Sequence, residues 1–225
     1  MMRNAIVLCS GGLDSVVTSY YVKNKLNYNN MKILFFDYGQ KSLNAERKCS
    51  KLTARNLKAE FIEIKLNFLS KISTSLINKE GKVKKIKIKD LKNSKEESKK
   101  FYVPCRNSIF LIYALSLAES LYVKGKEIYD IFVGFKNEGK ESYPDTTEYF
   151  VKEINKLSNF CQKRFKIKAP LIKKDKEDII LLGKGLDVDF KQTHSCYISN
   201  KPCGYCLACK LRQAGFYWAG QESLK

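Results

Sequence analysis

The chain turns sharply at Ser10-Gly11-Gly12-Leu13-Asp14-Ser15, directly after the apolar run Ala5–Cys9. A short, continuous apolar run that ends at glycines is typical of a buried parallel strand. Two glycines let the backbone turn tightly, and the residues that follow, Asp14–Lys25, have a helical pattern. The stretch therefore predicts a strand, a tight turn and a helix in immediate succession.

The same alternation continues along the chain. The expected strands are Lys32–Phe36, Glu60–Ile64 and Ile128–Gly134, and the expected helices are Ser42–Leu57, Asn107–Leu121, Thr147–Phe165 and Asp175–Leu182. Strands that alternate with helices pack as a parallel sheet between helical layers. We therefore expect an α/β fold, a Rossmann-like doubly wound parallel sheet with helices on both faces.

The glycine turn has the composition of a phosphate-binding loop. Its successive backbone N–H groups and the N-terminus of the following helix would form a cradle for an anion. The turn lacks the third glycine of the dinucleotide motif GxGxxG and the lysine of the Walker motif, so it belongs to neither class. Asp37, at the carboxyl end of the second strand, lies where such sheets bind ligands, although an Asp before Gly39 is equally typical of a turn.

The composition limits the class of protein. Of 225 residues, 42 are Lys or Arg and 23 are Asp or Glu, which gives a formal net charge of +19. A hydrophobic content of 44% excludes a wholly disordered chain. The basic excess favours an anionic partner: a nucleic acid, a membrane surface or a phosphate-rich small substrate. We find no signal peptide and no long apolar run, so we expect a cytoplasmic protein that does not associate with membranes.

Two segments depart from the α/β pattern. Residues 79–100 hold 10 Lys and 4 acidic residues, which predicts a flexible, lysine-rich insertion. From His194 onward the chain is rich in Cys, with Gly and Pro. We therefore expect a nucleotide domain of residues 1–192 and a cysteine-rich segment of residues 193–225 that ends in a helix.

The cysteine-rich segment has the spacing of a metal site. Cys203, Cys206 and Cys209 are separated by two residues each, and Cys196 precedes them by seven positions. Four thiolates can close a tetrahedral site that leaves no open position for water, which predicts structural Zn²⁺; an iron–sulfur cluster is the alternative. His194, the only histidine, is expected to pack beside this site rather than to titrate in a reaction.

The loop and its context resemble a known superfamily. SGGxDS directly after a first strand is similar to the loop of the N-type ATP pyrophosphatases, or PP-loop enzymes, which cleave ATP between the α and β phosphates and adenylate a substrate. The resemblance implies an adenine nucleotide alpha hydrolase-like fold, with Asp14 near Mg²⁺. It implies that ATP contacts Asp37 and Leu8, Cys9, Ser10, Gly11, Gly12, Leu13, Asp14, Ser15, Val16, Val17 and Thr18.

Several further stretches, in the same order along the chain, resemble the 7-cyano-7-deazaguanine synthase (QueC) family. They are Phe36-Asp37-Tyr38-Gly39-Gln40 with Glu46 downstream, Val103-Pro104-Cys105-Arg106-Asn107, Tyr143-Pro144-Asp145, Pro170-Leu171, and Ser195-Cys196-Tyr197 before the Cys-Gly-x-Cys tail. The resemblance covers nearly the whole chain. It implies conversion of 7-carboxy-7-deazaguanine and ammonia to the nitrile at the expense of ATP, by a homodimer that does not act directly on nucleic acid.

The resemblance also implies roles for individual side chains. Asp14, Arg106 and Lys176 would act in catalysis, the last two as cations beside the phosphates. The segment Tyr143, Pro144 and Asp145 would shape the pocket for the base, although a cap at the start of a helix is an equally good interpretation of Asp145. The sequence departs from the family pattern at Cys105, at His194 and in the segment before Tyr143 that ends at Ser142. The resemblance therefore predicts the acceptor pocket less firmly than the ATP site.

Two other functions are compatible with the sequence. A transfer-RNA thiolase would share the ATP loop and the metal module, and Cys105 beside Arg106 would be its nucleophile, unless Cys105 is simply a small buried thiol. A zinc module that binds nucleic acid without catalysis would explain the charge but not the phosphate loop. Cys9, Cys49 and Cys161 are isolated and are expected to fill the core.

Overall fold

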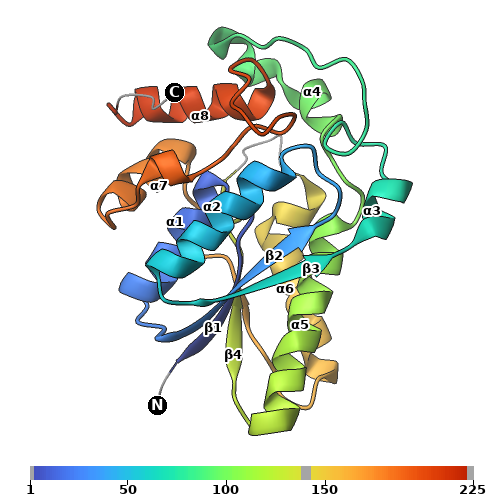
Figure 1. Ribbon diagram of the computed structural model, residues 1–225, viewed down its shortest axis with the longest axis vertical. Helices are drawn as coiled ribbons and strands as arrows, with labels where there is room; N and C mark the ends of the chain where they lie inside the picture. The colour runs from blue at the N-terminus through green and yellow to red at the C-terminus, as the bar shows by residue number, and fades with distance from the viewer. Residues whose placement is uncertain (1–2, 138–142, 222–225) are drawn as a thin grey trace.

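The computed structural model describes residues 3–137 and 143–221 (Figure 1). Its strands are β1 (Asn4–Leu8), β2 (Asn30–Asp37), β3 (Glu60–Lys65), β4 (Tyr129–Phe132) and β5 (Ile167–Lys168). Its α-helices are α1 (Leu13–Asn24), α2 (Leu43–Asn56), α3 (Asn67–Ile72), α4 (Lys95–Lys99), α5 (Arg106–Gly125), α6 (Glu148–Leu157), α7 (Lys176–Lys184) and α8 (Leu207–Trp218). Short 3-10 helices are η1 (Ile88–Asn93), η3 (Pro144–Thr146), η4 (Ser158–Phe160) and η5 (Phe190–Gln192).

The five strands form one parallel sheet in the order β3-β2-β1-β4-β5. β1 lies at the centre, with Leu8 opposite Leu34 of β2 on one side and Val7 opposite Phe132 of β4 on the other. The strand order reverses at β1, and ligands of open α/β sheets bind outside the carboxyl ends of the strands at such a point. The turn at residues 10–15 occupies this position.

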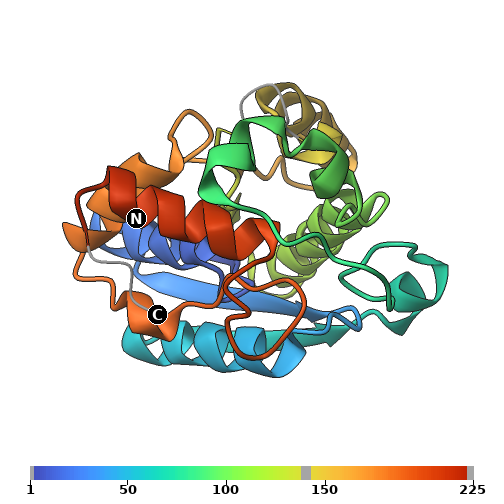
Figure 2. The ribbon, with the colours of Figure 1, turned by 90° about the horizontal axis from the view of Figure 1, so that it is seen from above.

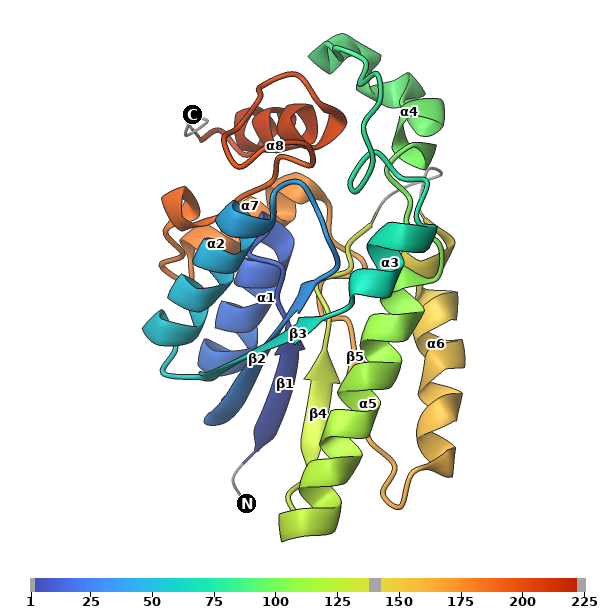
Figure 3. The same ribbon diagram turned by 45° about the vertical axis from the view of Figure 1, so that its right-hand side comes forward.

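Helices cover both faces of the sheet, as the alternating pattern predicted. Figure 3 shows α1, α2 and α7 on one face and α5 and α6 on the other. The apolar side chains of the strands divide accordingly: Val7 and Ile33 pack toward α1, whereas Ile6 and Leu34 pack toward α5. This two-sided burial explains why the strands are continuous apolar runs. The α/β fold is confirmed.

α5 has the length and the apolar composition of a membrane-spanning helix. Among the described residues it is the one helix long and apolar enough to cross a membrane, by length and composition alone. In the structure, Leu111, Ala114 and Ala118 of α5 are fully buried against the sheet. The apolar composition of α5 thus matches its place as the principal covering helix of that face.

The lysine-rich insertion contains η1 and α4, so part of it has regular structure. Ile86 and Leu91 pack with Leu207 and Ala214 of α8, and the N–H of Ile86 donates to the carbonyl oxygen of Tyr205 at 3.1 Å. Figures 1 and 2 show α8 beyond the carboxyl ends of the strands, beside this insertion. The flexibility expected for residues 79–100 stays a prediction, but the insertion has a packing partner in the cysteine-rich segment.

Two details of the expected secondary structure were wrong. The helix expected over Thr147–Phe165 ends at Leu157, where Asn155 turns its side chain to the backbone of Ile167 instead: Nδ2 donates to its carbonyl at 2.9 Å, and Oδ1 accepts its N–H at 2.9 Å. These bonds hold Ile167 beside the end of α6. The edge strand β5 was not predicted, because two residues carry no detectable period.

Candidate active site

The turn after β1 adopts a conformation that glycine alone adopts without strain. Gly11 has a φ of +76°, and a Cβ atom there would lie 2.4 Å from the carbonyl oxygen of Glu46 in α2. Ser15 Oγ donates to the carbonyl oxygen of Gly12 at 3.0 Å, and Ser10 Oγ accepts the N–H of Gly12 at 3.3 Å. The turn is therefore held by its own serines and by α2, directly before the N-terminus of α1. That arrangement favours an anion.

The chain after β4 approaches the same turn. A Cβ atom on Gly134 would lie 2.9 Å from the backbone nitrogen of Ser15, so only glycine fits at this position. Lys136 follows two residues later and lines the same cavity as the turn. Sequence reasoning did not select either residue; the one available signal was a glycine at the end of an expected strand.

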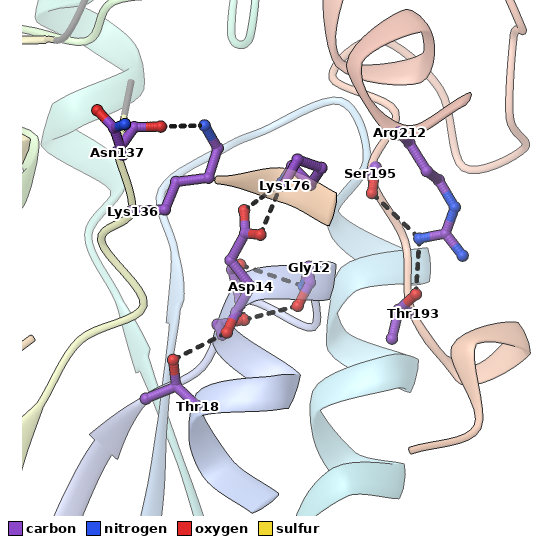
Figure 4. A network of polar contacts seen from close by, with 11 residues as sticks. Gly12, Asp14, Thr18, Lys136, Asn137, Lys176, Thr193, Ser195 and Arg212 are labelled. Carbon is purple, nitrogen blue, oxygen red and sulfur yellow. Dashed lines mark hydrogen bonds and ion pairs between the residues drawn. The ribbon is translucent and has the colours of Figure 1, made fainter. Parts of the chain in front are cut away.

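Asp14 and Lys176 form an ion pair at the start of α1. Lys176 Nζ lies 2.6 Å from each carboxylate oxygen of Asp14. Figure 4 draws both contacts. Lys176 is the first residue of α7, whose N-terminus is fixed by a reciprocal pair of hydrogen bonds between Asp175 and Asp178. α8 packs closely on this lysine, because a Cβ atom on Gly215 would lie 2.3 Å from Lys176 Cγ. Two of the predicted catalytic residues are thus in direct contact.

A cavity of about 810 Å³ extends from the turn across the carboxyl ends of the strands. Its lining includes Leu8, Cys9, Ser10, Gly12, Leu13, Asp14 and Ser15 from the predicted ATP segment. Val16, Val17 and Thr18 are buried within α1 and pack away from it, with Thr18 Oγ1 donating to the carbonyl oxygen of Asp14 at 2.9 Å. The structure therefore brings the first part of that segment to the cavity and places the rest in the core.

Arg106 stands on the wall of this cavity at the first turn of α5. Its Nη1 donates to Tyr38 Oη at 3.3 Å, and its guanidinium lies 5.6 Å from the centre of the Tyr38 ring. Burial raises the pKa of Tyr38 to about 12, so this phenol remains protonated. Arg106 and the Asp14–Lys176 pair, which come from opposite layers of the fold, therefore line the same cavity.

Glu46 contributes a half-buried carboxyl group to the lining of the same cavity. It accepts hydrogen bonds from Ser42 Oγ and from Gln40 Nε2, the latter at 3.0 Å. Burial raises the pKa of Glu46, and nearby Arg106 and His194 oppose that rise. In the sequence, Glu46 belongs to the stretches that resemble the family, but no role was predicted for it.

Two predicted acidic groups have structural partners instead. Asp37 pairs with Arg47, Oδ2 to Nη2 at 3.1 Å, and its other oxygen accepts the N–H of Gly39 at 3.2 Å. Asp145 is buried and accepts the backbone N–H of Asn107 at 3.4 Å, at the start of α5, and burial raises the pKa of its carboxyl. Neither carboxylate is part of the cavity lining.

The rest of the predicted base pocket lies at the cavity rim. Tyr143 lines the cavity, donates to the carbonyl oxygen of Ser98 at 2.9 Å and stacks on Tyr102 with ring centres 5.8 Å apart. Pro144 begins η3. Ser142, where the sequence departs from the family pattern, lies outside the described residues.

The four cysteines of the tail converge. The Sγ atoms of Cys196, Cys203, Cys206 and Cys209 all lie within 4.8 Å of one another, and those of Cys203 and Cys209 are 3.9 Å apart. A zinc–sulfur bond of about 2.3 Å in a tetrahedron places sulfurs about 3.8 Å apart, so the cluster has the dimensions that a four-coordinate metal needs.

The remaining cysteines differ in exposure. Cys9 fills the core as expected, but that expectation was wrong for Cys49 and Cys161, which are only half-buried. Partial burial still raises the pKa of Cys49 to about 11. Burial also raises the pKa of Cys161. Cys105 is exposed, has a φ of +56° and immediately precedes α5, and it is not part of the cavity lining. A thiol in this place lacks the contact with the cavity that a nucleophile would need.

A parallel sheet with an SGGxDS turn at its switch point, an aspartate–lysine pair and a cavity beside them define a PP-loop ATP pyrophosphatase. Comparison with known structures supports the fold: the chain has a TM-score of 0.51 and 11% identity to a 4-thiouridine synthetase in complex with RNA and bound ATP. That similarity covers 97% of this chain and 53% of the other, so this chain spans about half of that structure.

The chain belongs to the family described as Queuosine biosynthesis protein QueC, which it matches over residues 4–220. A protein of Methanosphaera stadtmanae named 7-cyano-7-deazaguanine synthase is 34% identical over 222 residues, covering 96% of this chain and 94% of its own. A protein of the same name from Nitratiruptor sp. is 37% identical over 229 residues, with coverage of 97% and 96%. The family resemblance noted in the sequence is confirmed.

Proposed function

We propose that this protein is an ATP-dependent ligase that converts 7-carboxy-7-deazaguanine and ammonia to 7-cyano-7-deazaguanine, with release of AMP and pyrophosphate. The observation that carries the proposal is one cavity that joins the phosphate loop, the Asp14–Lys176 pair and Arg106. Relatives along almost the entire chain carry the name of this activity. A cytoplasmic location and a homodimer are parts of the same proposal.

The first half of the reaction forms an amide. A carboxylate oxygen of the acid attacks the α-phosphorus of ATP, and the bond to pyrophosphate breaks. Ammonia then attacks the acyl carbon, the bond from that carbon to the phosphate oxygen breaks, and AMP leaves with the electron pair. The added nitrogen then loses one proton to solvent. Negative charge grows on the pyrophosphate and on the α-phosphate, so the loop N–H groups, Lys176 and Arg106 would stabilise both transition states.

The second half forms the nitrile. The amide oxygen attacks the α-phosphorus of a second ATP, pyrophosphate leaves, and loss of AMP with the two N–H protons gives the carbon–nitrogen triple bond. The same cations would serve because the same phosphorus is attacked. Tyr143, on the rim of the cavity, would contact the deazaguanine ring, whereas Asp145 would act through α5 by holding Asn107 beside Arg106.

Two metals belong to the proposal. Mg²⁺ bound with ATP would offset the charge of the polyphosphate, and Asp14 would offer it an oxygen ligand at the end of the loop. Zn²⁺ would be held by Cys196, Cys203, Cys206 and Cys209 as a structural ion, because four thiolates leave no open position for substrate. Metal analysis of protein purified without added metal should find about one zinc per chain. A brown, iron-containing product would contradict this assignment.

A substrate assay tests the function. Protein incubated with ATP, Mg²⁺, ammonium and 7-carboxy-7-deazaguanine should release AMP and pyrophosphate and form the nitrile, detected by mass spectrometry. Omission of the acid should abolish AMP release. Cleavage of ATP that requires transfer RNA and a sulfur donor would instead support a thiolase.

Cys105 separates the two functions further. A thiolase would need Cys105 as nucleophile, so Cys105→Ala should abolish thiolation. In the proposed ligase the residue lies outside the cavity, and Cys105→Ala should retain nitrile formation within about twofold of wild type.

A further inference from the structure

The segment that precedes the cysteine cluster, residues 193–195, lies against the phosphate loop. The backbone N–H of His194 donates to the carbonyl oxygen of Gly11 at 2.9 Å. The carbonyl oxygen of His194 lies 3.6 Å from the position that a Cβ atom on Gly12 would occupy. Because α2 also packs against Gly11, the loop has two supports: α2 and residues 193–195. The second support belongs to the last part of the chain.

One side chain holds this second support. Arg212 Nη1 donates to Thr193 Oγ1 at 2.7 Å and to Ser195 Oγ at 3.3 Å (Figure 4). Its Nη2 donates to the carbonyl oxygen of Phe190 at 2.8 Å. The guanidinium therefore binds the residues on both sides of His194. A planar group with five donors can make these bonds at once, whereas a lysine ammonium offers a single point of attachment.

The charge of Arg212 is satisfied by neutral acceptors. All three of its hydrogen-bond partners are hydroxyl or carbonyl oxygens, and none of the ion pairs recorded within residues 3–137 and 143–221 includes it. A guanidinium remains protonated at any physiological pH. A positive charge thus stays close behind the segment that supports the phosphate loop, where it favours an anionic ligand.

Arg212 is also tied to the cysteine cluster. It lies three residues after Cys209 on α8, and Cys206 is the residue directly before that helix. A cluster filled by a metal would fix the start of α8, because two of its four ligands belong to that start. The same helix packs on Lys176 through Gly215, so α8 reaches the phosphate site through two separate contacts.

We infer that Arg212 is a positioning residue that couples occupation of the cysteine cluster to binding of the nucleotide phosphates. With the cluster filled, α8 is fixed, Arg212 holds Thr193 and Ser195, and His194 keeps the loop in its binding conformation. The inference rests on the proposed function in one respect, which is that ATP is taken as the ligand of the loop.

Affinities for two nucleotides test the inference. In calorimetric titrations without acceptor, Arg212→Met should weaken binding of ATP–Mg²⁺ about tenfold, which is about 1.4 kcal/mol, and binding of AMP by less than about twofold. AMP lacks the pyrophosphate that the loop holds, so the ratio of the two affinities reports on the loop rather than on general stability. Lys210→Met, which removes a charge from the same helix, should leave the ratio unchanged. An unchanged ratio in Arg212→Met would overturn the inference.

Removal of the metal tests the coupling itself. Wild-type protein that has been stripped of its metal with a chelator, and then dialysed free of the chelator before titration, should show an ATP–Mg²⁺-to-AMP affinity ratio lowered as much as in Arg212→Met. The same treatment should lower the ratio of Arg212→Met no further. Two independent losses that multiply would overturn the coupling. Should Arg212→Met fail to fold, Thr193→Val removes one acceptor at nearly constant volume, and it should shift the ratio in the same direction. Wild-type protein that binds neither nucleotide would overturn both proposals, whereas normal binding with an insensitive ratio overturns this inference alone.

Discussion

Lys176 is the cation most directly placed for phosphate chemistry. It pairs with Asp14 at 2.6 Å, and its side chain is 15% exposed. Lys176→Met should lower kcat for AMP release by about 10²–10³-fold, because a preorganised charge beside the developing negative charge is lost. Lys173→Met is the matched control, since Lys173 is 82% exposed and pairs only loosely with Glu148 at 3.5 Å. Equal rates for the two variants, measured by AMP formation, would contradict the role of Lys176.

Glu46 gives the protein a pH-dependent stability. Burial raises the pKa of its carboxyl above the ordinary value of 4.5, so the folded protein binds this proton more tightly than the unfolded chain. The resulting stabilisation is complete below pH 4.5 and is lost as the pH rises through the pKa of the folded state.

Comparison with Glu46→Gln isolates this titration. The free energy of unfolding of Glu46→Gln, relative to wild type, should increase between about pH 4 and about pH 8, by about 1.4 kcal/mol for each unit by which the pKa is raised. Urea unfolding of both proteins at the two pH values measures it. A relative stability that stays constant, or that falls with pH, would contradict the assignment.

The sequence alone did not predict which acidic side chains line the cavity. Asp14 was identified because its motif fixes it in the chain, and the structure places it in the cavity. Asp37 and Asp145 had equally suggestive neighbours, yet Arg47 and the N-terminus of α5 bind them. Whether an acidic side chain faces the cavity depends on its tertiary contacts, and a local sequence pattern does not predict those contacts.

Among the elements, the insertion and α8 depend on each other. Ile86 is 5% exposed and packs in a small cluster with Leu207 and Ala214 of α8. Ile86→Ala would remove most of this contact, and a large-to-small change at a buried site costs about 2–5 kcal/mol. Because the cluster is separate from the main core, the lost packing energy should destabilise the insertion rather than the sheet domain.

Limited trypsin digestion measures this effect. Cleavage within residues 79–100 should accelerate in Ile86→Ala, while the melting temperature of the sheet domain changes little. Ile128→Ala is the control, because Ile128 is 44% exposed and lies far along the chain from the insertion. A uniform fall in melting temperature without faster cleavage of the insertion would show that the cluster is part of the main core.

The elements themselves were predictable where their pattern was long. The sequences of β1, β2, α2 and α5 follow clear apolar or helical periods. Most of their predicted boundaries lie within about two residues of the boundaries in the structure. β5 and η1 are too short to carry a period. The alternation predicted a parallel sheet covered by helices on both faces, but it did not predict the spatial order β3-β2-β1-β4-β5. The contact of α8 with the insertion was equally hidden, because it joins segments more than a hundred residues apart.

For the whole molecule, the net charge of +19 should produce RNA binding without consequence for the reaction. We expect weak binding of transfer RNA at about 50 mM salt that is largely lost at about 200 mM, because such binding rests on release of counterions. Addition of transfer RNA at the higher salt should leave AMP release unchanged. Stimulation by RNA at that salt would favour a nucleic-acid substrate over 7-carboxy-7-deazaguanine.

The distribution of the site along the chain has a consequence for synthesis. The phosphate loop lies at residues 10–15, but part of its support comes from Lys176, His194 and, through the neighbours of His194, Arg212. A growing chain on the ribosome therefore carries a loop that lacks its second support until residues 176–212 have emerged. Newly made protein should gain affinity for ATP only at release, so an incomplete chain would neither trap the nucleotide nor hydrolyse it wastefully.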